Sequence, residues 1–555
     1  MIGVQPQPHG ATPSRSNRPV NSRHELEYAG KSVSNRGTGN RRRRLLLQQL
    51  VALGGVSLLP AGALRAAPSL RFADDPFTLG VASGYPTPDD VVLWTRLAPS
   101  PLAPGGGMPP EVVAVEWEIA TDPQFRGIAR SGVEHATPEW AHSIHVEPGG
   151  LQPGRPYWFR FTAGGARSPV GRTATAPARG AVPARLRLAV ASCQQYEHGY
   201  YTAYQAMVAD DPDLIVHLGD YIYELSWGER RIRHHGSPEC HSLDDYRARY
   251  ALYKGDPMLK AAHAACPWLL TWDDHEVEND YAAEVSEEDD EPAWFLARRA
   301  AAYRACYEHQ PLPRRALPYG PFMRLHTQRG FGDLAGIIML DDRQYRSPQA
   351  CPRPGRRGSN RVSDCPERIA PGRSKLGARQ EAWLAARLEE SSSRWNLVAQ
   401  GTVMANIDEQ PGPGERYWTD GWSGYPAARE RLYAALETTR VRNPICLSGD
   451  IHSFLVAKLN RSAADPDSPV IATEFVTTSI SSQGLPAKMI EDRLRENAGL
   501  LAGSSAFRGY LRLDLHRDRA QADMVAMDTV FERESGSRVF ASFTIEDGSP
   551  LPQRS

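Results

Sequence analysis

The chain has 555 residues, which is too long for one ordinary domain, so a leader or tail plus two domains is expected. Its 64 Lys and Arg residues balance 65 Asp and Glu residues, and this near-neutral charge argues against a protein that coats nucleic acid or an anionic membrane. Hydrophobic residues at 41% and charged residues at 23% indicate a soluble globular chain and exclude a disordered, collagenous or multi-span one.

Residues 1–67 have the pattern of an unstructured region followed by an export signal. Residues 1–40 are polar and carry no hydrophobic periodicity. Arginines at 41–44 precede an apolar run at 45–59, which is shorter than the ~20 residues of a spanning helix, and small residues follow at 61–67. Arginine pairs before a weakly hydrophobic run resemble a twin-arginine signal, so we expect export by the twin-arginine translocase to the periplasm or the medium. The alternative is a basic tail with an interfacial helix.

The seven cysteines suggest three different roles. An odd number in an exported protein leaves at least one thiol outside intramolecular disulfides. Cys351 and Cys365 flank a loop rich in Pro, Gly and Arg, where they could form a disulfide or both stay free. Cys446 lies inside an apolar run and is predicted to be a small core residue. Cys193 ends a strand-like run, where a thiolate could bind a metal ion.

Residues 74–177 are predicted to form a small antiparallel β-sandwich. Short β-rich runs at 91–97, 112–120 and 157–163 alternate with turn clusters such as PTPDD and PGGG. At least three such strands within roughly 100 residues are typical of a sandwich. The stretch 174–183 is rich in Ala, Pro, Arg and Gly and is interpreted as a linker.

Residues 184–540 are predicted to form an α/β domain, because apolar runs separated by helix-like segments indicate sheets that are buried on both faces. The runs lie at 185–193, 213–220, 268–276, 335–342, 395–402, 445–452 and 470–479. Four of them end on residues that can bind a metal ion, namely Cys193, Asp220, Asp273, Asp274, His275, Asp450 and His452. Since α/β folds collect ligands at the carboxyl ends of their strands, we expect these four ends to converge on one site.

The residues at these strand ends favour a metal site. Asp and Asn are common wherever strands turn, which is the simple structural explanation. That explanation becomes less convincing when four strands end in Cys, Asp and His, because crowded carboxylates repel one another unless a cation is present. Asp220 and Tyr223 lie three residues apart just beyond a strand, so one turn can direct both at a single ion. A phenolate favours a hard trivalent ion, and with a Cys193 thiolate and a His452 imidazole it fits Fe(III) better than Zn(II) or Mg(II).

A second ion is predicted beside the first. A bridging Asp220, with Asp274 and Asp450, offers oxygen ligands that suit Ca(II), with Mg(II) or Mn(II) as substitutes. Asn279 lies in reach of the same ion. Two ions that share Asp220 would lie about 3.5–4 Å apart and would activate a hydroxide for in-line attack on phosphorus.

Further polar residues are candidates for contacting the substrate. Charge builds up on the equatorial phosphoryl oxygens during in-line attack, so donors aimed at these oxygens contribute most. His275 and Asn279 are the candidates for this contact. Arg343, just past the run at 335–342, is the first choice for an arginine partner, and Arg314 is the second. Both arginines could instead form ordinary salt bridges.

Eight motifs follow one another along most of the chain. They are GVASGYP, VVLWTRL, ASCQQYEHGYY, DLIVHLGDYIYE, TWDDHEVENDYA, LDDRQYR, WNLVAQ and LSGDIHS. This order resembles that of the PhoD-type alkaline phosphatases, whose site is similar to that of the purple acid phosphatases, and the resemblance extends from Phe77 to beyond Ser479. It implies a fibronectin III-like β-sandwich at 74–177 and an α/β calcineurin-like metallophosphoesterase domain at 184–540, with a two-layered β core flanked by helices.

The resemblance also implies roles for individual residues. The implied iron ligands are Cys193, Asp220, Tyr223 and His452. The implied calcium ligands are Asp220, Asp274 and Asp450, with the neighbouring Asp273 as the rival of Asp274. The family's YEH(M)PLR stretch is YEHQPLPRR in this chain, so an inserted proline alters the register of the arginine that follows.

These expectations lead to a hypothesis of function. We expect an exported alkaline phosphatase that hydrolyses small phosphate esters, monoesters or diesters, at an Fe/Ca site. One alternative is a phosphodiesterase that cleaves phospholipid or polymer diesters. Another, from a different class, is a non-catalytic surface-binding metalloprotein whose metals brace the fold, although a purely structural site is normally closed. The mature protein is predicted to be a monomer with no nucleic-acid partner and no stable membrane span.

Overall fold

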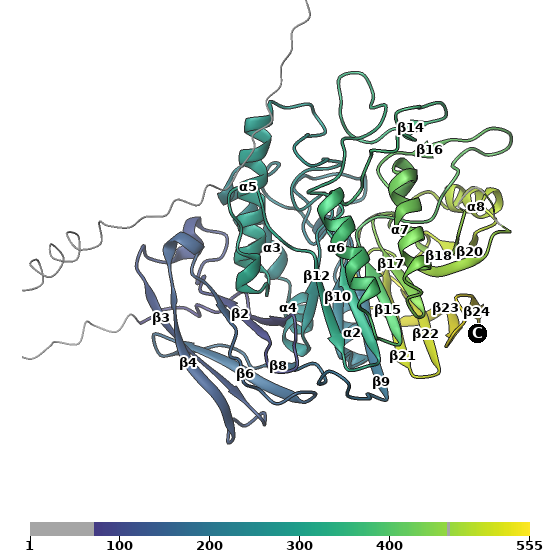
Figure 1. The fold of residues 1–555 in the computed structure, drawn as a ribbon. Helices are drawn as coiled ribbons and strands as arrows, with labels where there is room; N and C mark the ends of the chain where they lie inside the picture. Colours follow the sequence, from purple (N-terminus) through teal and green to yellow (C-terminus); the bar gives the residue numbers. More distant parts are fainter. Residues whose placement is uncertain (1–70, 463–464, 466) are drawn as a thin grey trace, which may run out of the picture. The chain divides into compact units, whose positions relative to one another are not determined.

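A computed structural model describes residues 71–555 except 463, 464 and 466 (Figure 1). The predicted export signal at 1–67 therefore lies outside the described residues. Among the helices of the described part, none combines the length and the apolarity that a bilayer span requires.

A five-stranded antiparallel sheet forms from the segment predicted as a sandwich. Its spatial order is β4 (Ile128–Ala136), β3 (Val113–Ala120), β6 (Pro156–Ala163) and β7 (Ala166–Arg167), and β8 (Gly171–Ala174) pairs with β6. Along β3 the side chains of Val113, Val115 and Trp117 are buried, whereas those of Ala114 and Glu116 are exposed. This alternation is typical of an antiparallel sheet with one face on a core and one face in solvent.

The largest sheet has ten strands and includes strands from both predicted domains. Its spatial order is β24 (Pro552–Arg554), β23 (Ser537–Glu546), β22 (Arg519–Met527), β21 (Gly509–His516), β9 (Arg185–Ala191), β10 (Leu214–His217), β11 (Trp268–Leu270), β1 (Val81–Gly84), β2 (Val92–Arg96) and β5 (Ser143–Val146). Strands β9, β10, β11 and β1 are parallel. Leu93 of β2 shares a core with Val115 and Phe159 of the five-stranded sheet. The N-terminal segment thus contributes three strands to the large sheet, and the boundary between residues 177 and 184 stays a prediction.

A seven-stranded sheet packs against the largest one. Its order is β12 (Thr327–Phe331), β13 (Ala335–Met339), β15 (Trp395–Ala399), β17 (Pro444–Ser448), β19 (Val470–Val476), β18 (Phe454–Asn460) and β20 (Leu500–Ser504). Ile337 and Leu397 face the core that this sheet shares with the ten-stranded sheet, whereas Ile338 and Val398 face a second core. Successive residues of a strand point to opposite faces, so both faces of the sheet are covered, as the apolar runs predict.

Helices cover the outer faces of the sheets (Figure 1). They are α2 (Thr202–Ala209), α3 (Leu243–Lys254), α4 (Pro257–Ala265), α5 (Pro292–His309), α6 (Gly377–Glu389), α7 (Pro426–Thr438) and α8 (Ala487–Glu496). Leu384 of α6 and Leu432 of α7 pack in the core that also holds Ile338 and Val398. Each predicted apolar run between 185 and 479 contains one observed strand. The described chain therefore consists of an N-terminal β-sheet region and a large β-rich region with two main sheets.

Cys351 and Cys365 form a disulfide, which resolves the alternative that the sequence left open. The bridge closes a loop that contains β14 (Arg361–Val362), and β14 pairs with β16 (Tyr417–Trp418). Cys446 is buried in the core, as predicted.

Removing this disulfide is expected to destabilise the protein. The two cysteines are 14 positions apart, and cross-linking a loop of that size is worth about 3 kcal/mol in the chain-entropy description. Guanidinium denaturation of the Cys351→Ser/Cys365→Ser double variant should give a lower midpoint than the oxidised wild type. The reduced wild type serves as the control and should unfold with the variant. Equal midpoints for all three samples would contradict the prediction.

Candidate metal centre

Four strand ends from two sheets converge on one place. Cys193, Asp220 and Asp274 follow β9, β10 and β11 of the ten-stranded sheet, and Asp450 and His452 follow β17 of the seven-stranded sheet. The parallel strands of each sheet bring these carboxyl ends to a common edge, where α/β folds place their ligands. The structure therefore brings the four predicted strand ends together.

Four predicted ligands form the first group. The ligand atoms of Cys193, Asp220 and His452 all lie within 4.8 Å of one another. The Tyr223 hydroxyl donates to Asp220 Oδ2 at 2.8 Å and lies 3.1 Å from His452 Nε2. His452 Nδ1 donates to the carbonyl of Gln483 at 2.7 Å, which leaves Nε2 free to accept or to bind a cation.

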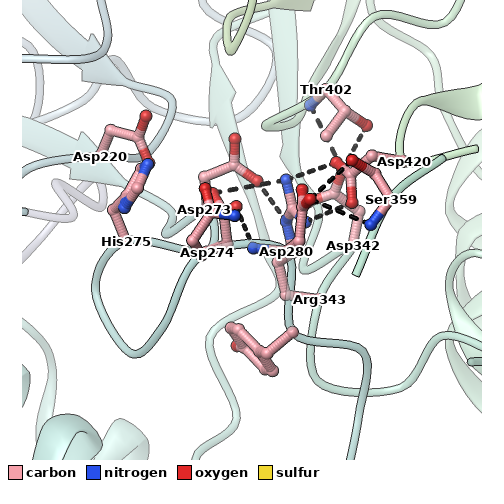
Figure 2. Close-up of polar contacts among 12 residues, drawn as sticks. Asp220, Asp273, Asp274, His275, Asp280, Asp342, Arg343, Ser359, Thr402 and Asp420 are labelled. Carbon is pink, nitrogen blue, oxygen red and sulfur yellow. Dashed lines mark hydrogen bonds and ion pairs between the residues drawn. The ribbon is translucent and has the colours of Figure 1, made fainter. Parts of the chain in front are cut away.

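A second group shares Asp220 with the first. Oxygen atoms of Asp220 and Asp274 and a ring nitrogen of His275 lie within 4.8 Å of one another. Figure 2 shows Asp220 beside His275, with Asp273 and Asp274 next to them. His275 Nδ1 donates to Glu224 Oε2 at 2.7 Å, and Glu224 Oε1 accepts the backbone N–H of Asn279 at 2.7 Å. One buried glutamate therefore orients both residues that were predicted to contact a phosphoryl group.

The electrostatics of these groups fit bound cations. Burial and the charge of Asp220 raise the pKa values of the Cys193 thiol and the Tyr223 phenol well above their usual range. Burial opposes ionisation of Asp220, but His275 and His452 outweigh it and lower its pKa to about 2. Within the described chain, Asp220 Oδ1 has no hydrogen-bond partner although it is buried. A hard cation would satisfy that oxygen and stabilise the thiolate and phenolate.

The backbone at this site is held in an unusual conformation. Cys193, Asp220, Asp450 and His452 have φ angles of 58°, 56°, 69° and 50°. Non-glycine residues in the left-handed region cost on the order of 1–3 kcal/mol each in strained cases and cluster at active and ligand-binding sites. Asp and His adopt this region more readily than most residues, whereas Cys does not, and the four turns together place this unusual backbone at one set of predicted ligands.

Gly219 shows why the loop after β10 needs a glycine. It adopts φ +116°, and an added Cβ would lie 2.5 Å from both the backbone N and the Cβ of Asp273. A side chain at this position would push apart the loops that carry Asp220 and Asp274.

Glu276 is a positioning residue that the sequence did not reveal. Its buried carboxylate accepts the backbone N–H groups of Asp220 at 3.1 Å, Tyr221 at 2.6 Å and Asp273 at 2.9 Å. It thereby ties the loop after β10 to the loop after β11. The only sequence signal was its place at the end of the WDDHE motif, where an acidic residue can equally be another ligand.

Arg343 does not occupy the predicted position in the substrate cavity. Its side chain is 0% exposed, Nε donates to Asp273 Oδ1, and Nη1 donates to Asp420 Oδ1 at 2.8 Å (Figure 2). Nη2 lies 3.5 Å from Asp274 Oδ1. Arg343 therefore contacts Asp273 and Asp274 from within the core and does not line the cavity. This placement does not fit the expected contact with a phosphoryl group. A position just past a strand cannot tell which way the side chain points.

The other arginine candidate and the choice between two aspartates also depend on the tertiary contacts. Arg314 is half-exposed and pairs with Glu134 of β4 at 2.5 Å, away from the converging strand ends. Asp273 is engaged by Arg343, whereas Asp274 is near Asp220 and lines the cavity. The geometry thus favours Asp274 over Asp273 as a ligand.

A cluster of buried charged side chains contacts the site through Arg343. Asp420 pairs with Arg343 and Arg346 at 2.8 Å each, and its carbonyl accepts Lys375 Nζ at 2.7 Å. All four side chains are fully buried. Burial raises the pKa of Asp420, but the three cations outweigh it and hold this pKa far below its usual value.

The disulfide loop is joined to the same site. Ser359 donates to Asp280 Oδ2 through its backbone N–H at 3.0 Å and its hydroxyl at 2.6 Å (Figure 2). The backbone N–H of Asp280 in turn donates to Asp274 Oδ2 at 2.6 Å. The loop between Cys351 and Cys365 therefore helps to orient a predicted calcium ligand.

A cavity of about 590 Å³ opens over both groups. Its wall includes six residues of the predicted site, namely Asp220, Asp274, His275, Asn279, Asp450 and His452. The apolar part of the wall includes Trp227, Trp418 and Leu485. Among the described residues, the arginines that line the cavity are Arg356, Arg361 and Arg493. Cys193 and Tyr223 are buried beneath this surface. The arrangement can hold cations under a space large enough for an organic phosphate.

Comparisons with known proteins find similar chains over most of this one. A family model described as PhoD-like phosphatase matches residues 188–524, and one described as PhoD-like phosphatase, N-terminal domain matches residues 63–177. Alkaline phosphatase D of Bacillus subtilis (strain 168) is 43% identical over 517 residues, which cover 91% of this chain and 87% of that protein. A solved structure of PhoD superposes with a TM-score of 0.84 at 43% identity, over 88% of this chain and 93% of that one.

Proposed function

The chain belongs to the PhoD-like phosphatase family and is a phosphoric ester hydrolase, and on this premise we propose that its cavity hydrolyses phosphate esters at alkaline pH with iron and calcium. The observation that carries the metal proposal is the meeting of the ligand atoms of Cys193, Asp220 and His452 within 4.8 Å. A thiol, a carboxylate and an imidazole at that spacing, next to an open cavity, fit a catalytic metal site better than a structural one.

The donor types support an assignment of the two ions. Cys193, Asp220, Tyr223 and His452 would hold Fe(III). Asp220, Asp274 and Asp450 would hold Ca(II), with Mg(II) or Mn(II) as substitutes. When bound, the ions would polarise the phosphoryl oxygens and lower the pKa of water.

The protein's own groups would bind and orient the ester. His275 and Asn279 line the cavity, and Glu224 fixes the His275 ring and the Asn279 backbone. Asn279 Nδ2 also donates to Glu287 Oε2 at 2.9 Å, which orients the amide and leaves its second N–H for a phosphoryl oxygen. Donors oriented in this way would stabilise the charge that develops on the phosphoryl oxygens. Glu276 and Arg343 would preserve the spacing of the two carboxylate loops, since both bind Asp273.

The finer architecture and the export route are part of the same proposal. The five-stranded sheet facing β1, β2 and β5 supports a fibronectin III-like N-terminal domain. Two packed sheets between helices support a calcineurin-like catalytic domain. The pattern of residues 41–67 supports export by the twin-arginine translocase to the periplasm or the medium, where the mature chain would act as a monomer.

Calcium removal is expected to abolish turnover reversibly. The purified mature protein should hydrolyse a chromogenic phosphate monoester at alkaline pH with calcium present, lose this turnover on chelation and regain it when calcium returns. Metal analysis before and after chelation should find iron retained. Turnover that survives the loss of calcium would contradict the calcium assignment, and protein that contains iron but hydrolyses no ester would contradict the proposed function.

A diester substrate is a second candidate, and one observation favours it. A neighbouring cavity of about 280 Å³ shares three lining residues with the main cavity, so space continues beyond the room that a simple monoester fills. The ratio of monoester to diester turnover in the same assay decides between the two substrate classes.

A further inference from the structure

Three residues form the boundary between the two cavities. Arg361, Pro486 and Arg493 line both the main cavity, which contains the metal-binding groups, and the neighbouring cavity. Arg361 lies in β14, and Arg493 lies on α8. A ligand in the main cavity therefore has both the metal-binding groups and these two guanidinium groups in its walls.

These two arginines share a single carboxylate. Glu409 Oε2 accepts Arg361 Nε at 2.5 Å, and Glu409 Oε1 accepts Arg493 Nη2. We call Arg361, Glu409 and Arg493 the Arg361–Glu409–Arg493 triad. Its two guanidinium groups and one carboxylate have a net charge of +1. The triad differs from Arg356 at the rim, which is already neutralised by Glu287 and Glu288 at 2.8 Å each.

Arg493 retains unused hydrogen-bonding capacity. Its side chain is 4% exposed, and Nε and Nη1 have no hydrogen-bond partner among the residues that the structure describes. Unpaired donors of a buried cation are costly, so this guanidinium is suited to binding an anion. Arg361 is 39% exposed, contacts Glu409 through Nε and lines both cavities, so a ligand in either cavity can reach this side chain.

The carboxylates of the neighbouring cavity other than Glu409 are already engaged, whereas Arg416 Nη2 donates to the backbone carbonyl of Glu409 at 2.9 Å and adds a further cation. Asp492 pairs with Lys488 at 3.0 Å and also with Arg495. Asp408 Oδ1 accepts the backbone N–H groups of Gln410 at 2.8 Å and Arg416 at 2.9 Å. These carboxylates are neutralised or hydrogen-bonded locally, so they repel an anion beside the Arg361–Glu409–Arg493 triad less than free carboxylates would.

We propose that Arg361 and Arg493 form a distal anion subsite that binds a second negatively charged group of the substrate. The inference rests on the proposed function, because it adds a second contact to an ester whose phosphoryl group lies at the metal centre. The substrate class is a phosphate ester whose organic part carries a carboxylate or a further phosphate. Guanidinium groups bind both anions through paired hydrogen bonds.

The subsite is held in place before a ligand arrives. Arg361 pairs with Trp418 across the two-stranded ladder of β14 and β16, within the loop closed by Cys351 and Cys365. Arg493 is buried on α8 and is held by Glu409. Little side-chain ordering is then needed on binding, so the contact can contribute to affinity and to selectivity.

Matched substrates test the proposal with the full mature protein. Phosphate release is followed for alkyl phosphates and for analogues of the same chain length that end in a carboxylate or in a phosphonate, which cannot be hydrolysed. At the best chain length we expect the second anion to raise kcat/KM about tenfold or more, as charge-assisted hydrogen bonds do. The carboxylate and phosphonate arms distinguish the two kinds of anion.

Arginine variants locate the effect. In Arg361→Gln and in Arg493→Gln the ratio of kcat/KM for the charged and uncharged substrates should fall toward one. Arg356→Gln, which removes a cavity arginine that Glu287 and Glu288 already neutralise, should keep the wild-type ratio. Thermal denaturation of each variant excludes misfolding, and the half-exposed Arg361 provides the test if Arg493→Gln does not fold.

Two outcomes overturn the subsite. One is a wild-type ratio near one at every chain length, and the other is a ratio that survives Arg361→Gln. In both cases hydrolysis of the alkyl phosphates would still support the proposed function. Failure to hydrolyse any of the esters would instead count against the proposed function itself.

Discussion

Asp220→Asn is expected to lower phosphate-ester turnover roughly a thousandfold, which corresponds to about 4 kcal/mol of transition-state stabilisation. Asp220 is the residue that both groups of ligand atoms share, and its Oδ1 has no hydrogen-bond partner within the described chain. Its lowered pKa, about 2, keeps it ionised at any assay pH near or above neutrality. Asparagine preserves the shape and can still accept from Tyr223, so the variant removes mainly the charge that two cations would share.

The measurement combines steady-state kinetics with metal analysis of the purified variant. Asp514→Asn is the matched control, because Asp514 lies on β21 of the same sheet, pairs with Arg187 at 2.8 Å and does not line the cavity. Loss of metal together with activity would support the shared-ligand role of Asp220. Unaltered turnover in Asp220→Asn would exclude it.

Asp420→Asn is expected to lower the free energy of unfolding by about 3–5 kcal/mol, as breaking a buried ion pair usually does. The variant leaves Arg343 and Arg346 without the carboxylate that neutralises them in the core. Because Arg343 also binds Asp273, we expect a secondary loss of activity. Guanidinium denaturation followed by circular dichroism measures the change in stability.

The pH dependence of this effect has a definite sign. The charges of Arg343, Arg346 and Lys375 hold the folded-state pKa of Asp420 below the value of about 3.9 that an unfolded aspartate has. A group with a lowered pKa contributes its full stabilisation above the unfolded pKa and loses it as the pH falls toward the folded value. The difference between wild type and Asp420→Asn should therefore stay constant from about pH 7 down to about pH 5 and shrink below about pH 4. Above about pH 8 the Lys375 ammonium loses its proton, because burial lowers its pKa to about 8, so the constant range ends there.

Asp211→Asn is the control for Asp420→Asn. Asp211 forms an ion pair with Arg172 at 2.6 Å, and both side chains are exposed, so the change in stability should be close to zero. If Asp420→Asn unfolds at the same denaturant concentration as Asp211→Asn, the buried cluster does not stabilise the fold as proposed.

The sequence was sufficient to predict the apolar strands at the centre of the two main sheets and the polar residues at their ends. The apolar runs from 185 to 479 each contain a strand, because a strand buried on both faces needs a short uninterrupted apolar segment, and that pattern is local. Parallel strands bring their carboxyl ends to one edge of the sheet, and Cys193, Asp220 and His452 meet there. This convergence can be predicted without knowing which way each side chain points.

The directions of individual side chains and the pairing of distant segments depend on the packing of the whole fold. It directs Asp274 to the cavity and Asp273 to Arg343, adds β1, β2 and β5 to the large sheet, and joins Glu409 to Arg361 and Arg493. Neighbours such as Asp273 and Asp274 have the same chemistry and nearly the same position in the chain. Their roles differ because residues far away in the sequence neutralise one and leave the other facing the cavity, and such contacts are set by the packing of the two sheets.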